Sequence, residues 1–260
     1  MNKILLIRRA AIFSPNSVDK DRAILDAVGI RLRDKGMEVT TVTEDNLTDD
    51  MQADTYLSMA RSRRALDILR HHENDGLTVI NSAAGIDYCT RREYIPVRDR
   101  IRTVVDGRGY WLKRIDSVAI QKDDVCYAEG VAGVSDRLAA FRHRGINDVM
   151  ITEHVTGDVV KFYGVSGTSF FRIFYPTDDG LTKFDDENIN GEAHHYGFSI
   201  NELHDEAERI ARMSGVKIYG GDCIVRSNGS FVIVDFNDWP SFSRCRDEAA
   251  EAVAGLIGKE

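Results

Sequence analysis

The chain has 260 residues, of which 43% are hydrophobic and 29% are charged, and its formal net charge is -8. This composition is typical of a soluble globular protein with a sizeable core, and the negative charge argues against a nucleic-acid-binding surface. No apolar run approaches the ~20 residues that a membrane-spanning helix needs, and the start is too short in apolar length for a signal peptide. We therefore expect a cytoplasmic protein with no membrane partner. The four cysteines are far apart, which indicates reduced, buried thiols.

Strand-like and helix-like patterns alternate over residues 1–95. Short apolar runs predict strands at Lys3–Ile7, Glu38–Val42, Thr55–Met59 and Leu77–Asn81. Helical periodicity predicts helices within Val18–Lys35 and at Arg61–Glu73. The expected apolar positions of the first helix are Ile24, Leu25, Val28, Ile30 and Leu32. This alternation predicts a βαβ layout with a mostly parallel sheet, which would form a first domain.

Shorter elements follow in residues 96–155 and 156–260. In the first of these ranges the predicted strands are Tyr110–Arg114, Ser117–Ile120, Val125–Tyr127 and Val149–His154, and the predicted helix is Ser135–Arg144. In the second range the predicted elements before the last hairpin are the strands Val159–Val165 and Ser169–Tyr175 and the helix Ile200–Met213. A final helix is expected between Ser243 and Ile257. The polar stretch Pro176–Phe198 has no clear period, so it is a candidate substrate loop.

A hairpin is predicted between the last two helices. Two β-prone runs, Asp222–Ser227 and Ser230–Phe236, are joined by Asn228-Gly229. Both joining residues tolerate the positive φ of a type I′ turn, so we expect a two-residue loop. The neighbouring residues are apolar enough that both strands are expected to be buried on both faces.

This hairpin register brings two carboxylates together. With a two-residue loop Asp222 lies opposite Asp235, and opposed residues on one face have Cβ atoms about 4.5–5.5 Å apart. Asn237 lies two residues beyond Asp235 and points to the same face. Opposed carboxylates share a proton or hold a cation, and two carboxylates with an amide oxygen suit Mg²⁺. The alternative is a hairpin with solvated acids at its base.

Common catalytic signatures are absent from the sequence. There is no P-loop, no glycine-rich dinucleotide motif, no zinc-protease H-E-x-x-H and no G-x-S-x-G. Adjacent histidines occur at His71-His72 and His194-His195, but neighbours on a strand point to opposite faces, which favours ordinary roles over metal binding. Arg244 and Arg246 open the last helix and could either hold an anion or be surface charges.

Taken in order, these pieces resemble the ATP-grasp superfamily. The resemblance rests on Asp222, Asp235 and Asn237, on the segment EHVTGDVVKFYGV, and on Lys113 in an earlier strand. The segment GGDCIV…FVIVDFNDWPSF is also similar to inositol polyphosphate kinases and carboxylate–amine ligases of that superfamily. The resemblance implies an α/β (α+β) architecture: a Rossmann-like N-terminal domain at 1–95, a small central lid domain at 96–155, and a larger C-terminal antiparallel-sheet domain with the metal site at 156–260.

The resemblance also implies roles for single residues, with ATP and two Mg²⁺ ions as cofactors. The metal ligands would be Asp222, Asp235 and Asn237. The nucleotide contacts would be Lys113 at the phosphates, the hinge residues Glu153, His154 and Val155 at the adenine, and Asp158 at the ribose. The cations that neutralise the transferred phosphate or the substrate would be Lys161 and Arg172. For Asp158, a role as a turn residue is as compatible with the sequence as a ribose contact. For Lys113, the alternative to a phosphate contact is a solvated position on a strand.

The sequence departs from the family in two places. Residues 114–119 lack the glycine-rich loop that usually closes over the phosphates after the lysine strand. The earlier phosphate-binding lysine is also not obvious, and its candidate replacements are Arg91, Arg92, Arg98 and Arg100.

Three functions are compatible with these patterns. The first hypothesis is an ADP-forming ligase that makes an acyl phosphate on a carboxylate and joins it to an amine or similar nucleophile of a small-molecule or peptide substrate. The second is a small-molecule kinase of the same fold, although the acidic residues of Pro176–Phe198 argue against a polyphosphorylated substrate. The third, suggested by the missing glycine-rich loop, is a nucleotide-binding module without turnover.

Overall fold

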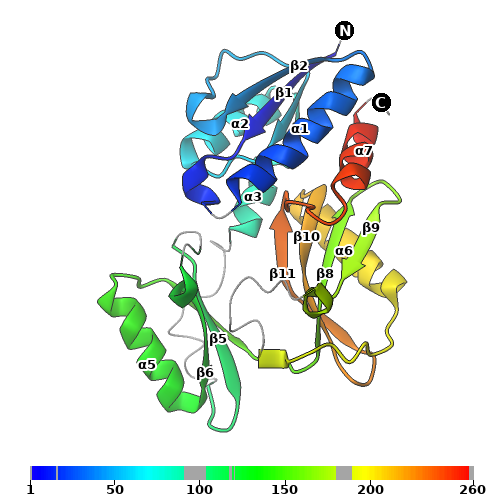
Figure 1. Ribbon diagram of the computed structural model, residues 1–260. Coiled ribbons are helices and arrows are strands. Elements are labelled where there is room, and N and C mark those ends of the chain that lie inside the picture. The colour runs from blue at the N-terminus through cyan, green and yellow to red at the C-terminus, as the bar shows by residue number, and fades with distance from the viewer. Residues whose placement is uncertain are drawn as a thin grey trace.

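The strands in the described part of the chain form three sheets, which lie in three successive parts of the sequence. The structure is a computed structural model that describes residues 2–15, 17–90, 104–116, 119, 121–179 and 189–257. We call the parts that carry the sheets the N-terminal unit (2–90), the central unit (104–153) and the C-terminal unit (158–257). In Figure 1 the N-terminal unit lies at the top, the central unit at the lower left and the C-terminal unit at the lower right.

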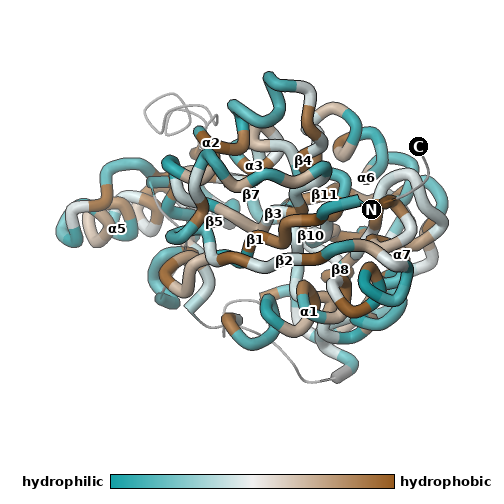
Figure 2. The backbone as a smooth tube through the Cα atoms, turned by 90° about the horizontal axis from the view of Figure 1, so that it is seen from above, coloured by the Kyte–Doolittle hydropathy of each residue, from teal (hydrophilic) through white to brown (hydrophobic). Residues whose placement is uncertain are grey.

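The N-terminal unit is a parallel sheet with helices on both faces. Its strands are β1 (Lys3–Arg8), β2 (Glu38–Thr43), β3 (Thr55–Ser58) and β4 (Thr78–Ile80), in the order β2-β1-β3-β4. Its helices are α1 (Val18–Asp34), α2 (Arg63–Asn74) and α3 (Ala83–Cys89), with short 3-10 turns at Ala11–Phe13 and Glu44–Asn46. Figure 2 shows hydrophobic residues running along β1 in the middle of the unit. The predicted strands and the first two helices are confirmed.

Two details of this unit differ from the prediction. Ile30 is 56% exposed, so its place on the apolar side of α1 was wrong. It is offset by two residues, about 200°, from Val28, which is fully buried. Helix α3 was not predicted, because it is short; it begins where the Ser82 hydroxyl accepts a hydrogen bond from the Gly85 N–H at 3.0 Å.

The central unit is a small antiparallel sheet covered by one helix. Its strands are β5 (Gly109–Arg114), β6 (Val125–Glu129) and β7 (Val149–Glu153), in the order β6-β5-β7, with a 3-10 turn at Lys122–Asp124. Helix α5 (Gly130–His143) covers one face and begins before the predicted Ser135. The Val131 N–H at this helix start donates to the Asp106 carboxylate at 2.9 Å, a partner far away in sequence that local pattern cannot reveal.

The C-terminal unit is a four-stranded antiparallel sheet. Its strands are β8 (Asp158–Val165), β9 (Phe171–Phe174), β10 (Ile218–Val225) and β11 (Phe231–Asp238), in the order β11-β10-β8-β9. Its helical elements are a 3-10 turn at Pro176–Asp179, α6 (Ile200–Ser214) and α7 (Arg246–Leu256). The expectation that both hairpin strands are buried holds for β10 but is wrong for β11, because β11 is the edge strand.

The N-terminal and C-terminal units share one hydrophobic core. Helix α7 packs against α1, and Ile24 and Val28 lie in one cluster with Val253, Trp239 and Phe242 (Figure 1). Helix α6 packs on the other face of the C-terminal sheet, in a cluster that also contains Cys89 of α3. In the part of the chain that the structure describes, no helix is long and apolar enough to span a membrane.

Candidate functional site

One face of the C-terminal sheet carries a row of polar side chains that we call the acidic row: Lys161, Asp222, Asp235 and Asn237. Lys161 on β8 pairs in register with Asp222 on β10, which pairs with Asp235 on β11. Lys161 Nζ donates to Asp222 Oδ1 at 2.8 Å, and the Asn237 amide lies 2.6 Å from Asp235 Oδ2. Directly paired residues share a face, and Asn237 is two residues beyond Asp235, so all four lie on the face opposite α6.

The predicted pairing of Asp222 with Asp235 is confirmed, but the predicted turn is wrong. Val225 pairs with Phe231, so the loop is one residue longer than expected and is closed by Gly229 at φ 81°. This is a three-residue hairpin with a left-handed glycine, not a type I′ turn. A β-bulge beside Asp222 leaves Val234 as an extra residue and restores the original register. The two shifts cancel, and the two carboxylates still meet.

The acidic row fits a magnesium ion. Asp222 is 30% exposed in its side chain, and Asp235 is also half-buried, so both carboxylates can reach a hydrated ion. The oxygen and nitrogen of the Asn237 amide exchange places by a half-turn of the group, which makes its oxygen a third donor. Three oxygen donors leave positions for water and phosphate, as Mg²⁺ requires. Among the described residues, no group of three or more His, Cys, Asp or Glu side chains is arranged to hold a metal.

The two predicted cations differ in their surroundings. Lys161 lies in the acidic row, where it neutralises Asp222. Arg172 lies on β9 on the same sheet face, but its guanidinium pairs with Glu248 of α7 and lies 5.4 Å from the centre of the Phe170 ring. It is therefore held at α7, and the geometry does not support the predicted contact with transferred phosphate.

A second arginine packs against the cross-strand partner of Lys161. The Arg244 guanidinium carbon is 5.5 Å from the ring centre of Phe174, which pairs with Lys161. Burial raises the pKa of the neighbouring Tyr163 hydroxyl, and the positive charges of Lys161 and Arg244 oppose that rise. The sequence indicated Arg244, together with Arg246, as a candidate anion-binding residue at the start of the last helix, but its position over β9 depends on the fold.

The central unit presents aromatic side chains on the face opposite α5. Tyr110 and Leu112 point into the α5 core, so Trp111 and Lys113 point the other way. Trp111 Nε1 donates to His154 Nδ1 at 3.1 Å, and the Tyr127 ring meets both rings edge-on at centroid distances of 5.7 and 5.5 Å. Burial lowers the pKa of His154. Lys113 thus lies on a strand face beside a preformed aromatic cluster.

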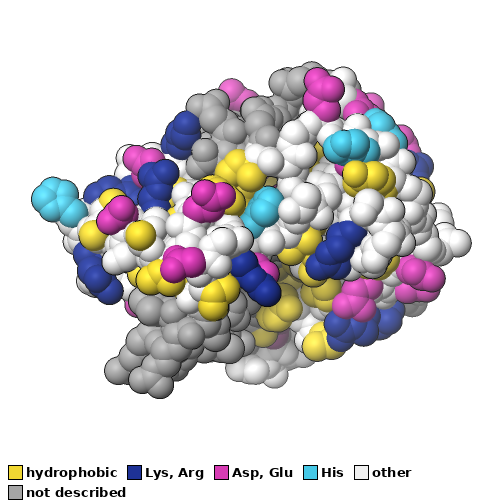
Figure 3. Space-filling view, turned by 90° about the horizontal axis from the view of Figure 1, so that it is seen from below, with side chains coloured by type: hydrophobic (Ala, Val, Ile, Leu, Met, Phe, Trp, Pro, Cys, Tyr) yellow, Lys and Arg dark blue, Asp and Glu magenta, His cyan; other side chains and the backbone are white. Residues whose placement is uncertain are grey.

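The predicted hinge joins the central and C-terminal units. Glu153 ends β7, and its carboxylate accepts from Arg108 at 2.6 Å. The His154 N–H donates to the Gly109 carbonyl at 2.8 Å, and Val155 follows it toward β8. The adenine contact of these residues remains a prediction. In Figure 3, charged side chains of both signs and hydrophobic side chains cover the surface between the central unit at the left and the C-terminal unit at the right.

Asp158 begins strand β8 and anchors a later segment, a role that differs from both the turn residue and the ribose contact considered from the sequence. It is 2% exposed, and its two oxygens accept from the backbone N–H groups of His194 at 2.8 Å and Tyr196 at 2.9 Å. The carboxylate therefore fixes the segment before α6, and this geometry does not favour a ribose contact.

Several sequence candidates lie elsewhere. His72 is buried in a stack with Tyr56, which is an ordinary core role. The candidate phosphate-binding arginines Arg91, Arg92, Arg98 and Arg100 lie outside the described residues, as does the middle of the polar stretch, residues 180–188. Most of the predicted strand Ser117–Ile120 also lies outside them.

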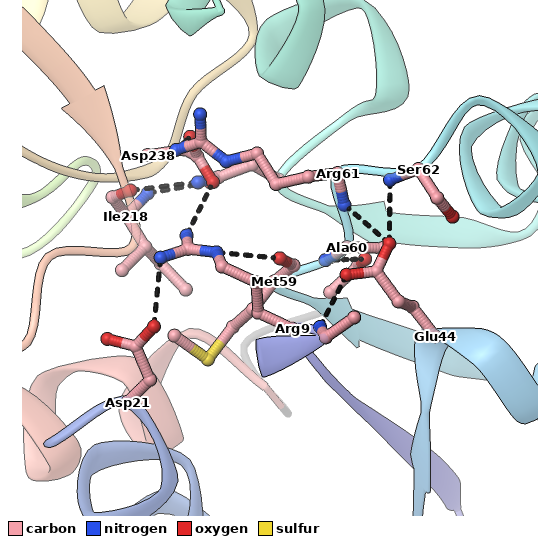
Figure 4. A network of polar contacts seen from close by, with 12 residues as sticks. Arg9, Asp21, Glu44, Met59, Ala60, Arg61, Ser62, Ile218 and Asp238 are labelled. Carbon is pink, nitrogen blue, oxygen red and sulfur yellow. Dashed lines mark hydrogen bonds and ion pairs between the residues drawn. The ribbon is translucent and has the colours of Figure 1, made fainter. Parts of the chain in front are cut away.

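Sequence reasoning missed a buried charge network where the N-terminal unit meets the end of β11 (Figure 4). It joins Arg9, Arg61 and Asp238, with Asp21 and Glu44 beside them. The signal available in the sequence was an arginine pair directly after the buried first strand and an aspartate directly after Asn237.

A search of the solved structures matched the whole described architecture. A RimK domain ATP-grasp protein from Sphaerobacter thermophilus is 16% identical with a TM-score of 0.58, over 98% of this chain and 99% of that one. D-alanyl-alanine synthetase A from Vibrio cholerae is 9% identical with a TM-score of 0.63, over 98% and 94%. The chain has the ATP-grasp fold. A D-alanine–D-alanine ligase from Bacillus anthracis complexed with ATP, 12% identical with a TM-score of 0.60 over 97% and 92%, has it too.

The ATP-grasp fold was the expectation from sequence, and it is confirmed with its parallel N-terminal sheet and two antiparallel sheets. No protein-family model and no curated protein matched the chain. The fold establishes the architecture around the acidic row, but the chemistry depends on the residues of the site.

Proposed function

We propose that the protein is an ATP- and Mg²⁺-dependent ligase that activates a carboxylate and joins it to an amine or a similar nucleophile. The observation that carries the proposal is the acidic row, with two opposed carboxylates, an amide and a lysine on the sheet face opposite α6. The ATP-grasp fold supports it, since the similar solved structures include proteins described as ligases and a macrocyclase.

Each polar group has a proposed task. Asp222, Asp235 and Asn237 would hold magnesium, which screens the negative charge of the phosphates when bound. Lys113, from the central unit, would contact the phosphates, and Lys161 would neutralise charge that develops during transfer. The main chain at Glu153–Val155 would contact the adenine.

The proposed reaction has two steps. A carboxylate oxygen of the substrate attacks the γ-phosphorus of ATP, the bond from that phosphorus to the bridging oxygen breaks, and ADP leaves. The amine nitrogen then attacks the acyl carbon, the bond from the acyl carbon to the phosphate oxygen breaks, and inorganic phosphate leaves while the nitrogen loses a proton. Fixed cations favour both steps because negative charge moves onto phosphate oxygens.

We expect Arg244, and not Arg172, to be the arginine that assists Lys161. Arg244 lies over Phe174, the cross-strand partner of Lys161, whereas the Arg172 guanidinium is directed to Glu248 on α7. We expect Arg244→Ala to lower ADP formation at least about tenfold, as removal of a charge-stabilising group does, and Arg172→Ala to change it less than about twofold. Equal losses in the two variants would contradict this assignment.

The first test is thermal unfolding with and without ATP plus Mg²⁺, on the wild type, Asp235→Asn and the control Asp67→Asn. Asp67 lies on the exposed side of helix α2, and among the described residues it pairs only with Arg70. A ligand at about 100 times its dissociation constant adds roughly 2.7 kcal/mol of stability. We expect a Mg²⁺-dependent rise in the wild type and the control that is lost in Asp235→Asn. A rise that survives in Asp235→Asn would refute the metal site.

The second test separates the ligase from its alternatives. Carboxylates and amines are screened in pairs for ADP release, with mass spectrometry of the products. A joined product that needs both partners supports the ligase, and a stable phosphorylated product from one partner supports a kinase. Mg-ATP binding without ADP from any pair would support a nucleotide-binding module.

A further inference from the structure

The end of β11 is held by the N-terminal unit through Asp238. This residue follows Asn237 directly, so its side chain points to the face opposite the candidate metal ligands. The Asp238 side chain is 0% exposed. One oxygen lies 3.4 Å from Arg9 Nη2, and the other accepts from Arg61 Nη2 (Figure 4).

Both arginines are fixed by other contacts before they reach Asp238. Arg9 follows β1 and donates from Nε to the Met59 carbonyl at 3.2 Å and from Nη1 to Asp21 at 3.0 Å. Arg61 follows β3, and its backbone N–H donates to Glu44 Oε2 at 2.9 Å. Glu44 also accepts from two neighbouring backbone N–H groups and is fully buried. These contacts set the position of the Arg9 guanidinium and of the Arg61 backbone at the carboxyl end of the parallel sheet.

The network places buried arginines against buried carboxylates. Two guanidiniums face the carboxylates of Asp21 and Asp238, and the exposed fractions of these four side chains run from 0% to 11%. Buried charges need such partners, because water does not screen them. Asp238 is the β11 residue that both guanidiniums contact, so removal of its carboxylate takes away both ion pairs between the end of β11 and the N-terminal unit.

The next residue secures the same strand end. The Trp239 N–H donates to the Ile218 carbonyl at 3.0 Å, and that carbonyl also accepts from the Asn81 amide at 2.8 Å. The backbone on the carboxyl side of Asn237 is thus tied to the N-terminal unit by one ion network and one shared carbonyl.

We propose that Asp238 is a positioning residue for the magnesium site. It holds the backbone of β11 so that Asn237 and Asp235 keep their places on the opposite face, and Arg9 and Arg61 set that position from the parallel sheet. This inference rests on the proposed ATP- and Mg²⁺-dependent function. The inference goes beyond that function because it assigns the N-terminal unit a part in metal affinity. None of the described residues of the N-terminal unit belongs to the acidic row.

The test measures ATP binding by calorimetry over a series of Mg²⁺ concentrations, and in EDTA, on the wild type, Asp238→Asn and Glu44→Gln. Glu44→Gln neutralises a buried carboxylate of the same network that does not touch β11, and its amide oxygen can still accept from the Arg61 N–H. We expect Asp238→Asn to raise the half-saturating Mg²⁺ concentration by about tenfold or more, the usual cost of losing a group that orients metal ligands. ATP binding in EDTA should not change. Glu44→Gln should lower the unfolding temperature while shifting the Mg²⁺ midpoint less than about twofold.

The outcome of this titration distinguishes a positioning role of Asp238 from a role in general stability. A midpoint for Asp238→Asn within about twofold of the wild type overturns the inference. So does an equal shift in Glu44→Gln, because general destabilisation would then explain both. If Asp238→Asn does not fold, Arg61→Lys decides by the same titration, since lysine keeps the charge but not the forked geometry. A wild type without Mg²⁺-dependent ATP binding refutes the proposed function itself, whereas a responsive wild type whose Mg²⁺ midpoint is unchanged by Asp238→Asn refutes only this inference.

Discussion

Replacing Asn81 by alanine removes the side chain that joins the parallel sheet to β10. Asn81 Nδ2 donates to the Ile218 carbonyl at 2.8 Å, and its Oδ1 accepts from the Ile218 N–H at 2.8 Å. Asn81 and Ile218 are both fully buried. The Ile218 carbonyl keeps its hydrogen bond from the Trp239 N–H, so losing the bond from Asn81 costs about 0.5–1.5 kcal/mol. The Ile218 N–H is left without an acceptor, at a cost of about 1–3 kcal/mol. We expect the free energy of unfolding to fall by about 2–4 kcal/mol.

Urea unfolding followed by circular dichroism measures this change, with Asn46→Ala as the matched control. Asn46 is exposed and bonds only to the Thr43 hydroxyl at 3.0 Å among the described residues, so its loss should be below about 0.5 kcal/mol. With an unfolding entropy of about 2.1 cal/mol/K per residue, a loss of about 3 kcal/mol lowers Tm by roughly 5–6 °C. A loss below about 1 kcal/mol for Asn81→Ala, or one equal to that of the control, would refute the reasoning.

Three further predictions concern single sites. Burial lowers the pKa of His154, so the folded protein favours the neutral imidazole, which accepts a hydrogen bond from Trp111. This group stabilises the fold above about pH 6.5, and its contribution is lost as the pH falls through the lowered pKa. Between pH 7.5 and 5.5 the Tm of His154→Gln should therefore fall less than that of the wild type, and equal falls would contradict this. A Cβ on Gly221 would lie 2.1 Å from the Asp235 carbonyl, so Gly221→Ala should cost about 1–3 kcal/mol in urea unfolding, whereas Gly255→Ala in α7 has open space and should gain up to about 1 kcal/mol. All four cysteines are buried, and burial raises the pKa of three of the thiols, so iodoacetamide at pH 8 should label the native protein far more slowly than the urea-unfolded chain; similar rates by mass spectrometry would refute this.

Local pattern predicted most of the elements and the parallel N-terminal sheet, because hydrophobic periodicity and turn residues can be recognised in short windows of sequence. The ATP-grasp fold was predicted from a resemblance to that superfamily. The runs that became β1, β3 and β10 are apolar enough to be read alone. The pairing of Asp222 with Asp235 was also predicted, although by a turn that the structure does not contain. A three-residue loop and a bulge shift the strands in opposite senses, and no local signal fixes a bulge.

The parts that could not be predicted depend on tertiary contacts. Nothing in the sequence links Arg172 to Glu248, and only the packing of α7 shows that these two residues form an ion pair. Asp158 was weighed as a turn residue or a ribose ligand, and the backbone amides that decide its role come from residues much later in the chain. The Asp238 network likewise joins residues from opposite ends of the sequence.

The shared core of α1 and α7 has a consequence for the order of folding during synthesis. Ile24 and Val28 leave the ribosome long before their partners Val253 and Ala254. The parallel sheet can pair its strands in the nascent chain, yet one side of α1 keeps an apolar surface until α7 has been made. Contacts of such long sequence separation form slowly, and surfaces that wait for them invite misassembly. The interval between the synthesis of α1 and that of α7 is therefore the period in which this apolar surface is open to wrong contacts.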